Sequence, residues 1–299
     1  MLFVKRNRGH RPDNDIEDRI RTLMQLSKYD KAIPLLRDSI HAVEAGQERE
    51  DLSSPRILRL YKYYGECLLN TEKFVPAVDI LYKGASICAS GQTNPCRETL
   101  HETALPAIVK FIKQNNSTED VSAIVKPISN RYPDTFKSVV LEAFLERAGG
   151  FFKNRDFELA AEAYEQVFAL AGEDNLLHFD DLIRAGDSLT KSGQLNKAWK
   201  VYEKAKASAD TFHKQCRVHK KIADLLVVRN QNWHAVYHFL IALQSVPSDR
   251  GARTKLKNTL RKLGMEKHTD KFLQLNAKYP DSKQLEISLM SLKKRLKVG

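Results

Sequence analysis

The sequence has little of what marks an all-β, membrane-spanning or disulfide-stapled protein. Its 299 residues include only 13 glycines and 10 prolines, and alternating β-branched residues are scarce. No apolar run approaches the ~20 residues that a helix needs to cross a bilayer. These absences favour a helical protein with a large solvent-facing surface, and we expect no membrane partner.

Cysteine is also sparse. Cys67, Cys88, Cys96 and Cys216 form no CxxC motif and have no even spacing. The first residues lack the uninterrupted apolar core of a secretory signal, and we interpret residues 1–15 as a basic tail, with a mitochondrial presequence as the alternative. We therefore expect reduced thiols and a cytoplasmic location, with mitochondria or cilia as alternatives.

Motifs that would carry chemistry are missing as well. The sequence has no Gly-rich phosphate loop, HExxH, GxSxG or DxDxDG motif, so we expect neither enzymatic activity nor a cofactor. The nearest approach to a metal site is the group His213, Cys216, His219, His234 and His238. On two antiparallel helices one or two of these side chains could meet, but not four. We expect no metal there.

What the sequence does contain is an internal repeat of small and aromatic residues. Gly186 and Ala198 are small where two antiparallel helices would cross, and Gly193 suits the positive φ at which the chain would reverse. The spacing of the larger residues is that of one helix face. The full frame in this stretch is Leu182, Gly186, Leu189, Gly193, Leu195, Ala198, Tyr202 and Ala205.

The same frame recurs elsewhere and resembles the tetratricopeptide repeat (TPR), W-x2-L-G-x2-Y, then A-x3-F, then P. The best copies repeat every 37–38 residues, at Ala148, Gly186 and Ala223, and none has the tryptophan of the first family anchor. The counterparts of Gly186 and Ala198 in the other three good copies are Gly65 and Ala77, Ala148 and Ala160, and Ala223 and Ala235.

The resemblance covers residues 16–280 and implies an all-α, right-handed TPR-like α-solenoid. A bend is possible near residues 89–98, and residues 281–299 are expected to form a basic capping helix. That helix has an apolar side made of Leu285, Leu289, Met290, Leu292 and Leu296. About seven helical hairpins are expected, at 16–44, 58–90, 99–133, 141–172, 179–208, 216–247 and 249–280.

The first helices of such arrays line a concave surface that holds a peptide or a helix of a partner protein. The resemblance places nine residues on that groove: Lys62, Glu66, Leu69, Leu145, Phe152, Ile183, Asp187, Lys220 and Asp224. The alternative is that they only pack neighbouring first helices together. Because Glu66 and Asp224 follow Lys62 and Lys220 by four residues, the sequence argues against a lysine clamp for a chaperone's terminal carboxylate.

Positive charge is concentrated at the two ends of the chain. The formal net charge is +12, of which residues 250–299 hold +10 and residues 1–12 hold +4. This asymmetry predicts an acidic partner, either RNA, a microtubule or an acidic protein, and the alternative is a solubilising surface. The predicted basic patch is Arg253, Lys255, Lys257, Arg261, Lys262, Lys293, Lys294, Arg295 and Lys297.

Together these patterns predict a non-catalytic adaptor or scaffold that binds a partner segment in the concave groove. The alternative is a structural subunit of a large assembly, anchored by its basic ends. An organellar ribosome or another RNA-associated assembly fits that description, and so does a microtubule or axoneme.

Overall fold

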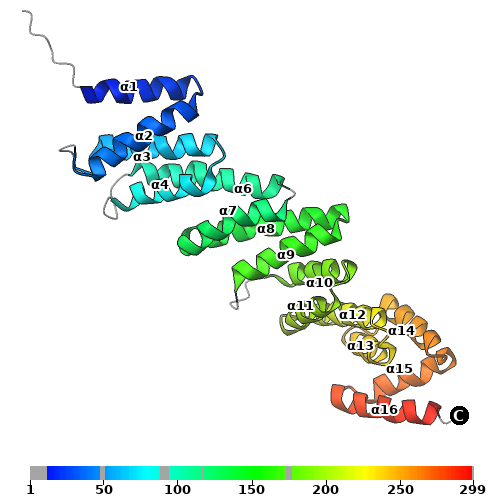
Figure 1. The fold of residues 1–299 in the computed structure, drawn as a ribbon. Helices are drawn as coiled ribbons and strands as arrows, with labels where there is room; N and C mark the ends of the chain where they lie inside the picture. The colour runs from blue at the N-terminus through cyan, green and yellow to red at the C-terminus, as the bar shows by residue number, and fades with distance from the viewer. Residues whose placement is uncertain (1–11, 48–50, 88–93, 116, 173–176, 298–299) are drawn as a thin grey trace, which may run out of the picture. The chain divides into compact units, whose positions relative to one another are not determined.

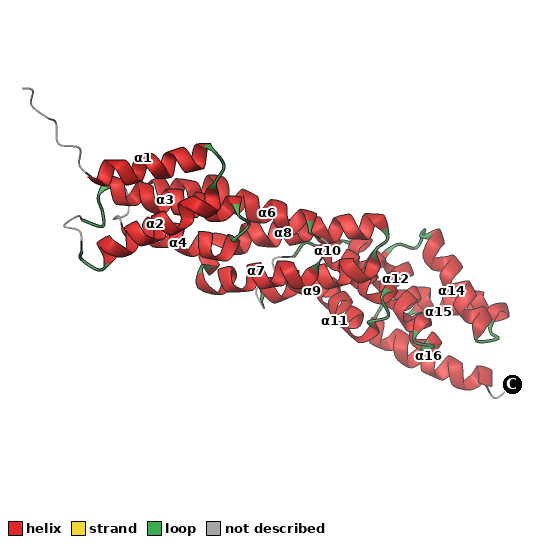
Figure 2. Cartoon of the chain, turned by 45° about the horizontal axis from the view of Figure 1, so that its top comes forward, coloured by secondary structure: helices red, strands yellow, loops and turns green. Residues whose placement is uncertain are grey.

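The computed structural model describes residues 12–47, 51–87, 94–115, 117–172 and 177–297. All regular secondary structure in these residues is helical, and they form no strand (Figure 2). The chain divides into two compact units, Met1–Ala143 and Phe144–Gly299. The all-α fold class predicted from the sequence is therefore confirmed.

The first unit is built from antiparallel helix pairs. Helix α1 packs on α2, α3 packs on α4, and the second helices α4 and α7 contact each other. The α1–α2 and α3–α4 pairs correspond to the predicted hairpins at 16–44 and 58–90, and helices α6 and α7 lie in the third predicted stretch, 99–133. The helices are α1 (Pro12–Gln25), α2 (Tyr29–Glu44), α3 (Pro55–Asn70), α4 (Phe74–Ile87), α5 (Pro95–Thr99), the π-helical turn η1 (Leu100–Ala104), α6 (Leu105–Gln114) and α7 (Thr118–Arg131).

Helix α8 (Pro133–Asn154) contains the boundary between the units, and the second unit continues from it with the same design. From α9 onward each helix contacts the next, the first helices α10 and α12 also touch, and so do the second helices α13 and α15 (Figure 1). This stacking of like helices is the packing of a TPR-like array. The helices are α9 (Phe157–Ala171), α10 (Phe179–Lys191), α11 (Leu195–Ala207), α12 (Phe212–Val228), α13 (Asn232–Ser245), α14 (Arg250–Lys262), the 3₁₀ turn η2 (Glu266–His268), α15 (Thr269–Lys278) and α16 (Ser282–Lys297).

The small residues of the repeat lie at the helix crossings, as predicted. A Cβ added at Gly186 would lie 2.3 Å from the Tyr202 ring, and one added at Gly65 would lie 2.4 Å from Leu81 Cγ. Ala198 and Tyr202 are fully buried. A larger side chain at either glycine would therefore push the two helices apart or displace the partner side chain.

The first helix of each clear copy ends in the same way. In the α10–α11 turn Gly193 has a φ of 78° and the Gln194 N–H donates to the Leu189 carbonyl over 2.8 Å, which is the Schellman arrangement. The positive φ predicted for Gly193 is confirmed. Gly264 adopts the same conformation, and other hairpins place different residue types there: Ser27, Glu72, Arg155 and Asn230.

Helix α16 forms in the segment predicted to be a capping helix, but its apolar side is narrower than predicted. Leu285 and Leu289 are buried and Leu292 is half-buried, whereas Met290 is 42% exposed. The prediction for Met290 was wrong because one residue after Leu289 the helix has turned by 100°, away from the core. The side chain of Leu296 lies outside the described residues.

Two further sequence predictions bear on the fold. Most of the possible bend at 89–98 lies outside the described residues, and the compact units divide at residues 143 and 144. In the part of the chain that the structure describes, no helix is long and apolar enough to cross a membrane.

Candidate functional site: the first-helix face of the second unit

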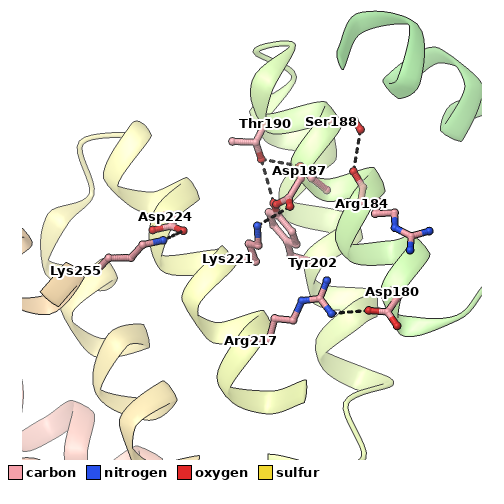
Figure 3. Close-up of polar contacts among 11 residues, drawn as sticks. Asp180, Arg184, Asp187, Ser188, Thr190, Tyr202, Arg217, Lys221, Asp224 and Lys255 are labelled. Carbon is pink, nitrogen blue, oxygen red and sulfur yellow. Dashed lines mark hydrogen bonds and ion pairs between the residues drawn. The ribbon is translucent and has the colours of Figure 1, made fainter. Parts of the chain in front are cut away.

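Ion pairs join the first helices α10 and α12 of the second unit. Arg217 Nη1 of α12 lies 2.5 Å from Asp180 Oδ1 of α10, and Lys221 Nζ lies 2.5 Å from Asp187 Oδ2 (Figure 3). Each pair connects residues on successive hairpins. We call the surface formed by α10, α12 and α14 the first-helix face.

The same arrangement continues from α12 to α14. Lys255 of α14 reaches Asp224 of α12 over 2.5 Å (Figure 3). Lys220 Nζ lies 2.7 Å from Asp249, which also caps α14 by accepting the Ala252 N–H over 2.6 Å. Burial opposes ionisation of Asp249, but hydrogen bonds from Lys220 and Ala252 lower its pKa below the usual value.

A buried tyrosine extends the α10–α12 pairing into the core. The Tyr202 hydroxyl of α11 donates to Asp187 Oδ1 over 2.6 Å, while Lys221 donates to Oδ2 of the same carboxylate (Figure 3). Burial and the neighbouring Asp187 charge raise the pKa of Tyr202. Asp187 therefore holds three helices together: its own, α11 and α12.

The pairs on this face differ in exposure. In the inner pairs the side chains of Asp187 and Asp249 are 19% and 20% exposed. In the outer pairs the Arg217 and Lys255 side chains are each 46% exposed. Inner pairs therefore fix the helices, and outer pairs present charged groups that solvent or a partner can reach.

The predicted groove residues do not form one exposed surface. Leu69 is 8% exposed and Ile183 is 1% exposed, so both belong to the core, and their prediction as groove contacts is corrected. Leu69 belongs to the buried side of α3, and Ile183 to the buried side of α10. Leu145 and Phe152 are half-buried, and the Phe152 ring packs edge-on against Phe157 at 5.7 Å between centroids.

The charged groove residues are engaged in ion pairs. In the first unit Lys62 pairs with Glu66 along α3 at 3.7 Å, and burial raises the pKa of Glu66. In the second unit Asp187, Lys220 and Asp224 all take part in the pairs between hairpins. The alternative reading, in which these residues hold neighbouring first helices together, accounts for those three.

The predicted basic patch is partly neutralised. Lys255 pairs with Asp224, and Glu266 accepts Arg261 through two bonds of 2.7 and 2.8 Å and Lys257 at 3.5 Å. Arg253 donates to the Pro247 carbonyl, Lys293 lies over the Trp233 ring, and the Lys297 side chain is outside the described residues. The remaining patch residues are exposed and have no ion pair in the described part: Lys262, Lys294 and Arg295.

The histidine group brings two side chains together, in agreement with the expectation that no more than two could meet. His219 Nδ1 and His238 Nδ1 lie 2.9 Å apart between α12 and α13. Burial lowers the pKa of His219 to about 4 and that of His238 to about 3, so both rings are neutral at pH 7. Among the described residues no group of three or more His, Cys, Asp or Glu is placed to hold a metal ion.

The described cysteines are buried. They are Cys67, Cys96 and Cys216, and Cys88 lies outside the described residues. Burial raises the pKa of Cys67 to about 12 and that of Cys216 to about 11, which leaves both as thiols at neutral pH. They behave as small core residues.

Sequence reasoning missed the partners in the ion pairs, such as Arg217 and Lys221. The signal was present: Asp180 and Arg217 are 37 residues apart and Asp187 and Lys221 are 34 apart, close to one repeat. Opposite charges one repeat apart on first helices meet when successive hairpins stack. A search at the repeat period would have found these pairs.

Comparisons with known proteins add little to the geometry. No family model matches the sequence, and no curated protein matches it. This chain is similar to a solved structure of the nearly identical TPR-like repeats of a kinesin light chain from Podosopora anserina. The match covers 80% of this chain and 97% of the solved chain. The identity is 15% and the TM-score is 0.31. The fold assignment therefore rests on the helix packing described above.

Proposed function

We propose that this chain is a non-catalytic scaffold that holds a segment of a partner protein on the first-helix face of the second unit. The observation that carries the proposal is the division of this face into inner and outer ion pairs. The inner pairs of Asp187 and Asp249 keep α10, α12 and α14 at fixed spacing, so the outer charged groups are preorganised for a partner.

The outer groups offer both signs of charge. Arg184 is 45% exposed and pairs within α10 with Asp181, and Arg217 pairs with the 59% exposed Asp180. Exposed ion pairs contribute little to folding, at most about 1 kcal/mol, so they can exchange their partners at small cost. A polar segment with carboxylates placed opposite Arg184 and Arg217 would fit this surface.

Capture of the partner tests the proposal. Immobilised wild-type chain is compared with Arg184→Ala/Arg217→Ala, and the matched control is Lys200→Ala/Lys204→Ala on the second helix α11. We expect the face variant to capture at least about tenfold less protein than the wild-type chain, and the control to capture as much as the wild-type chain. Equal capture by both variants, with unchanged melting, would show that the partner binds elsewhere.

A second candidate function is attachment to a polyanionic assembly. Lys262, Lys267 and Lys271 are exposed and have no ion pair in the described residues. Such cations would release counterions from RNA or a microtubule, so the affinity would fall steeply with salt. Changing all three to Gln should weaken binding to RNA and flatten its salt dependence; an unchanged salt slope would leave these charges as a solubilising surface.

A further inference from the structure

Helix α16 has an apolar pair on the side that faces solvent. Leu285 and Leu289 are buried on the side where α16 packs on α15 and α13. On the opposite side Ile287 is 71% exposed and Met290 is 42% exposed. At three residues apart, Ile287 and Met290 lie side by side on one helix face.

This pair is unusual for a solvent-facing helix surface in a repeat array, which is normally polar. Glu286, Ile287, Met290, Ser291 and Lys294 surround a hollow of about 450 Å³. The hollow is open and its lining is largely apolar.

The border of the hollow is basic. Lys283 and Lys294 are exposed and form no ion pair in the described part of the chain, and Arg295 follows them on the same helix. Glu286 is the single acid of α16. The surrounding residues 250–299 carry a net charge of +10.

We propose that the outer face of α16 binds an acidic amphipathic helix of a partner protein. Ile287 and Met290 would enter its apolar stripe, and its carboxylates would meet Lys283 and Lys294. This site is separate from the first-helix face, so it does not depend on the proposed function.

The charges and the size of the patch decide against other occupants. A second copy of α16 would bring two basic helices together and repel. A membrane surface needs a longer apolar face than two side chains to insert. A nucleic acid would use the cations but leave the apolar pair uncovered.

Two synthetic peptides test the proposal with the full-length chain. Both contain the same Leu, Glu and Ala residues; one spaces Leu at i, i+3, i+4 and i+7, and the other has the order scrambled. Binding is followed by fluorescence anisotropy. We expect the striped peptide to bind at least about tenfold more tightly than the scrambled one, since only the stripe covers Ile287 and Met290.

Variants separate the apolar from the charged contribution. Ile287→Ser/Met290→Ser should lower the affinity for the striped peptide about tenfold, and Lys283→Gln/Lys294→Gln should lower it and reduce its salt dependence. The control is Phe212→Ser, which removes a 71% exposed side chain from α12 and should change nothing. Because all these side chains are exposed, circular dichroism should show unchanged folding.

Three outcomes would overturn the proposal. The first is equal binding of the striped and scrambled peptides, which would mean attraction by charge alone. The second is binding of the striped peptide that both double variants leave unchanged. The third is binding of anionic vesicles or RNA through Ile287 and Met290 more tightly than the striped peptide.

Discussion

The hairpins α8–α9 and α10–α11 follow the same frame but treat their buried tyrosines differently. Ala148 and Tyr164 of the first correspond to Gly186 and Tyr202 of the second, and both tyrosines are essentially buried. In each hairpin the residue that follows Ala148 or Gly186 lies 15 positions before the buried tyrosine. In α10 that residue is Asp187, and in α8 it is Gly149.

This single difference decides whether the tyrosine hydroxyl is satisfied. Tyr202 donates to Asp187 over 2.6 Å. The Tyr164 hydroxyl is buried and makes no hydrogen bond among the described residues, and a Cβ at Gly149 would meet only open space. Burial raises the pKa of Tyr164 to about 12, against the opposing charge of the nearby Arg184.

The comparison shows that two sets of positions in one repeat have different roles. The small and aromatic positions set the helix crossing, which both hairpins share. The position occupied by Asp187 does not affect the crossing. It determines how the hairpin contacts the following hairpin, because Asp187 also accepts a hydrogen bond from Lys221 of α12. The first-helix face thus depends on a residue that the repeat frame does not specify.

The largest expected effect is at the crossing itself. Gly186→Ala places a methyl group against the Tyr202 ring, where the Cβ would lie 2.3 Å from Cε1, and should destabilise the chain by about 2 kcal/mol. Ala148→Gly, the reverse change in the other hairpin, should cost only about 1 kcal/mol through helix propensity. Urea unfolding monitored by circular dichroism measures both. A cost near zero for Gly186→Ala would show that the Tyr202 ring moves aside and that the crossing is not close.

Removing the two hydroxyls should give different results. Tyr202→Phe leaves the half-buried Asp187 carboxylate without one donor and should cost about 1–2 kcal/mol. Tyr164→Phe removes a buried group that has no partner and should change stability by less than about 0.5 kcal/mol or increase it. The same unfolding assay compares them. A similar loss in both variants would mean that Tyr164 has a partner after all.

The missing acceptor can be supplied. Gly149→Asp should stabilise the chain by about 1 kcal/mol, through a hydrogen bond to Tyr164 and the lower backbone entropy of a non-glycine residue. A double-mutant cycle with Tyr164→Phe isolates the hydrogen bond from the backbone effect. A coupling energy near zero would show that the aspartate does not reach the hydroxyl.

The smallest effects are expected at the turns. Gly193 and Arg155 both have positive φ, at 78° and 67°. Gly193→Ala should cost up to about 1 kcal/mol, while Arg155→Gly should stabilise by a few tenths, because only glycine adopts this conformation without a steric cost. Thermal unfolding compares the two variants. Stabilisation by Gly193→Ala would contradict the positive φ at that residue.

The sequence by itself determined the helices, the pairing of neighbours and the register of the core. These follow from local spacing: Gly186 and Ala198 must be small for their helices to cross, and Leu189 must precede the turn at Gly193. Such constraints act between residues of one hairpin, where the period of a helix fixes which side chains face each other. They needed no knowledge of how one hairpin meets the next.

Only the tertiary structure decided which first-helix residues are accessible. Ile183 and Asp187 are four residues apart on α10, yet Ile183 is in the core and Asp187 joins Tyr202 to Lys221. Likewise Leu289 is buried while the adjacent Met290 is exposed. A periodic pattern predicts which residues share one face of a helix. Whether that face is buried depends on the distance and angle of the neighbouring helices, and side chains far apart in the sequence determine both.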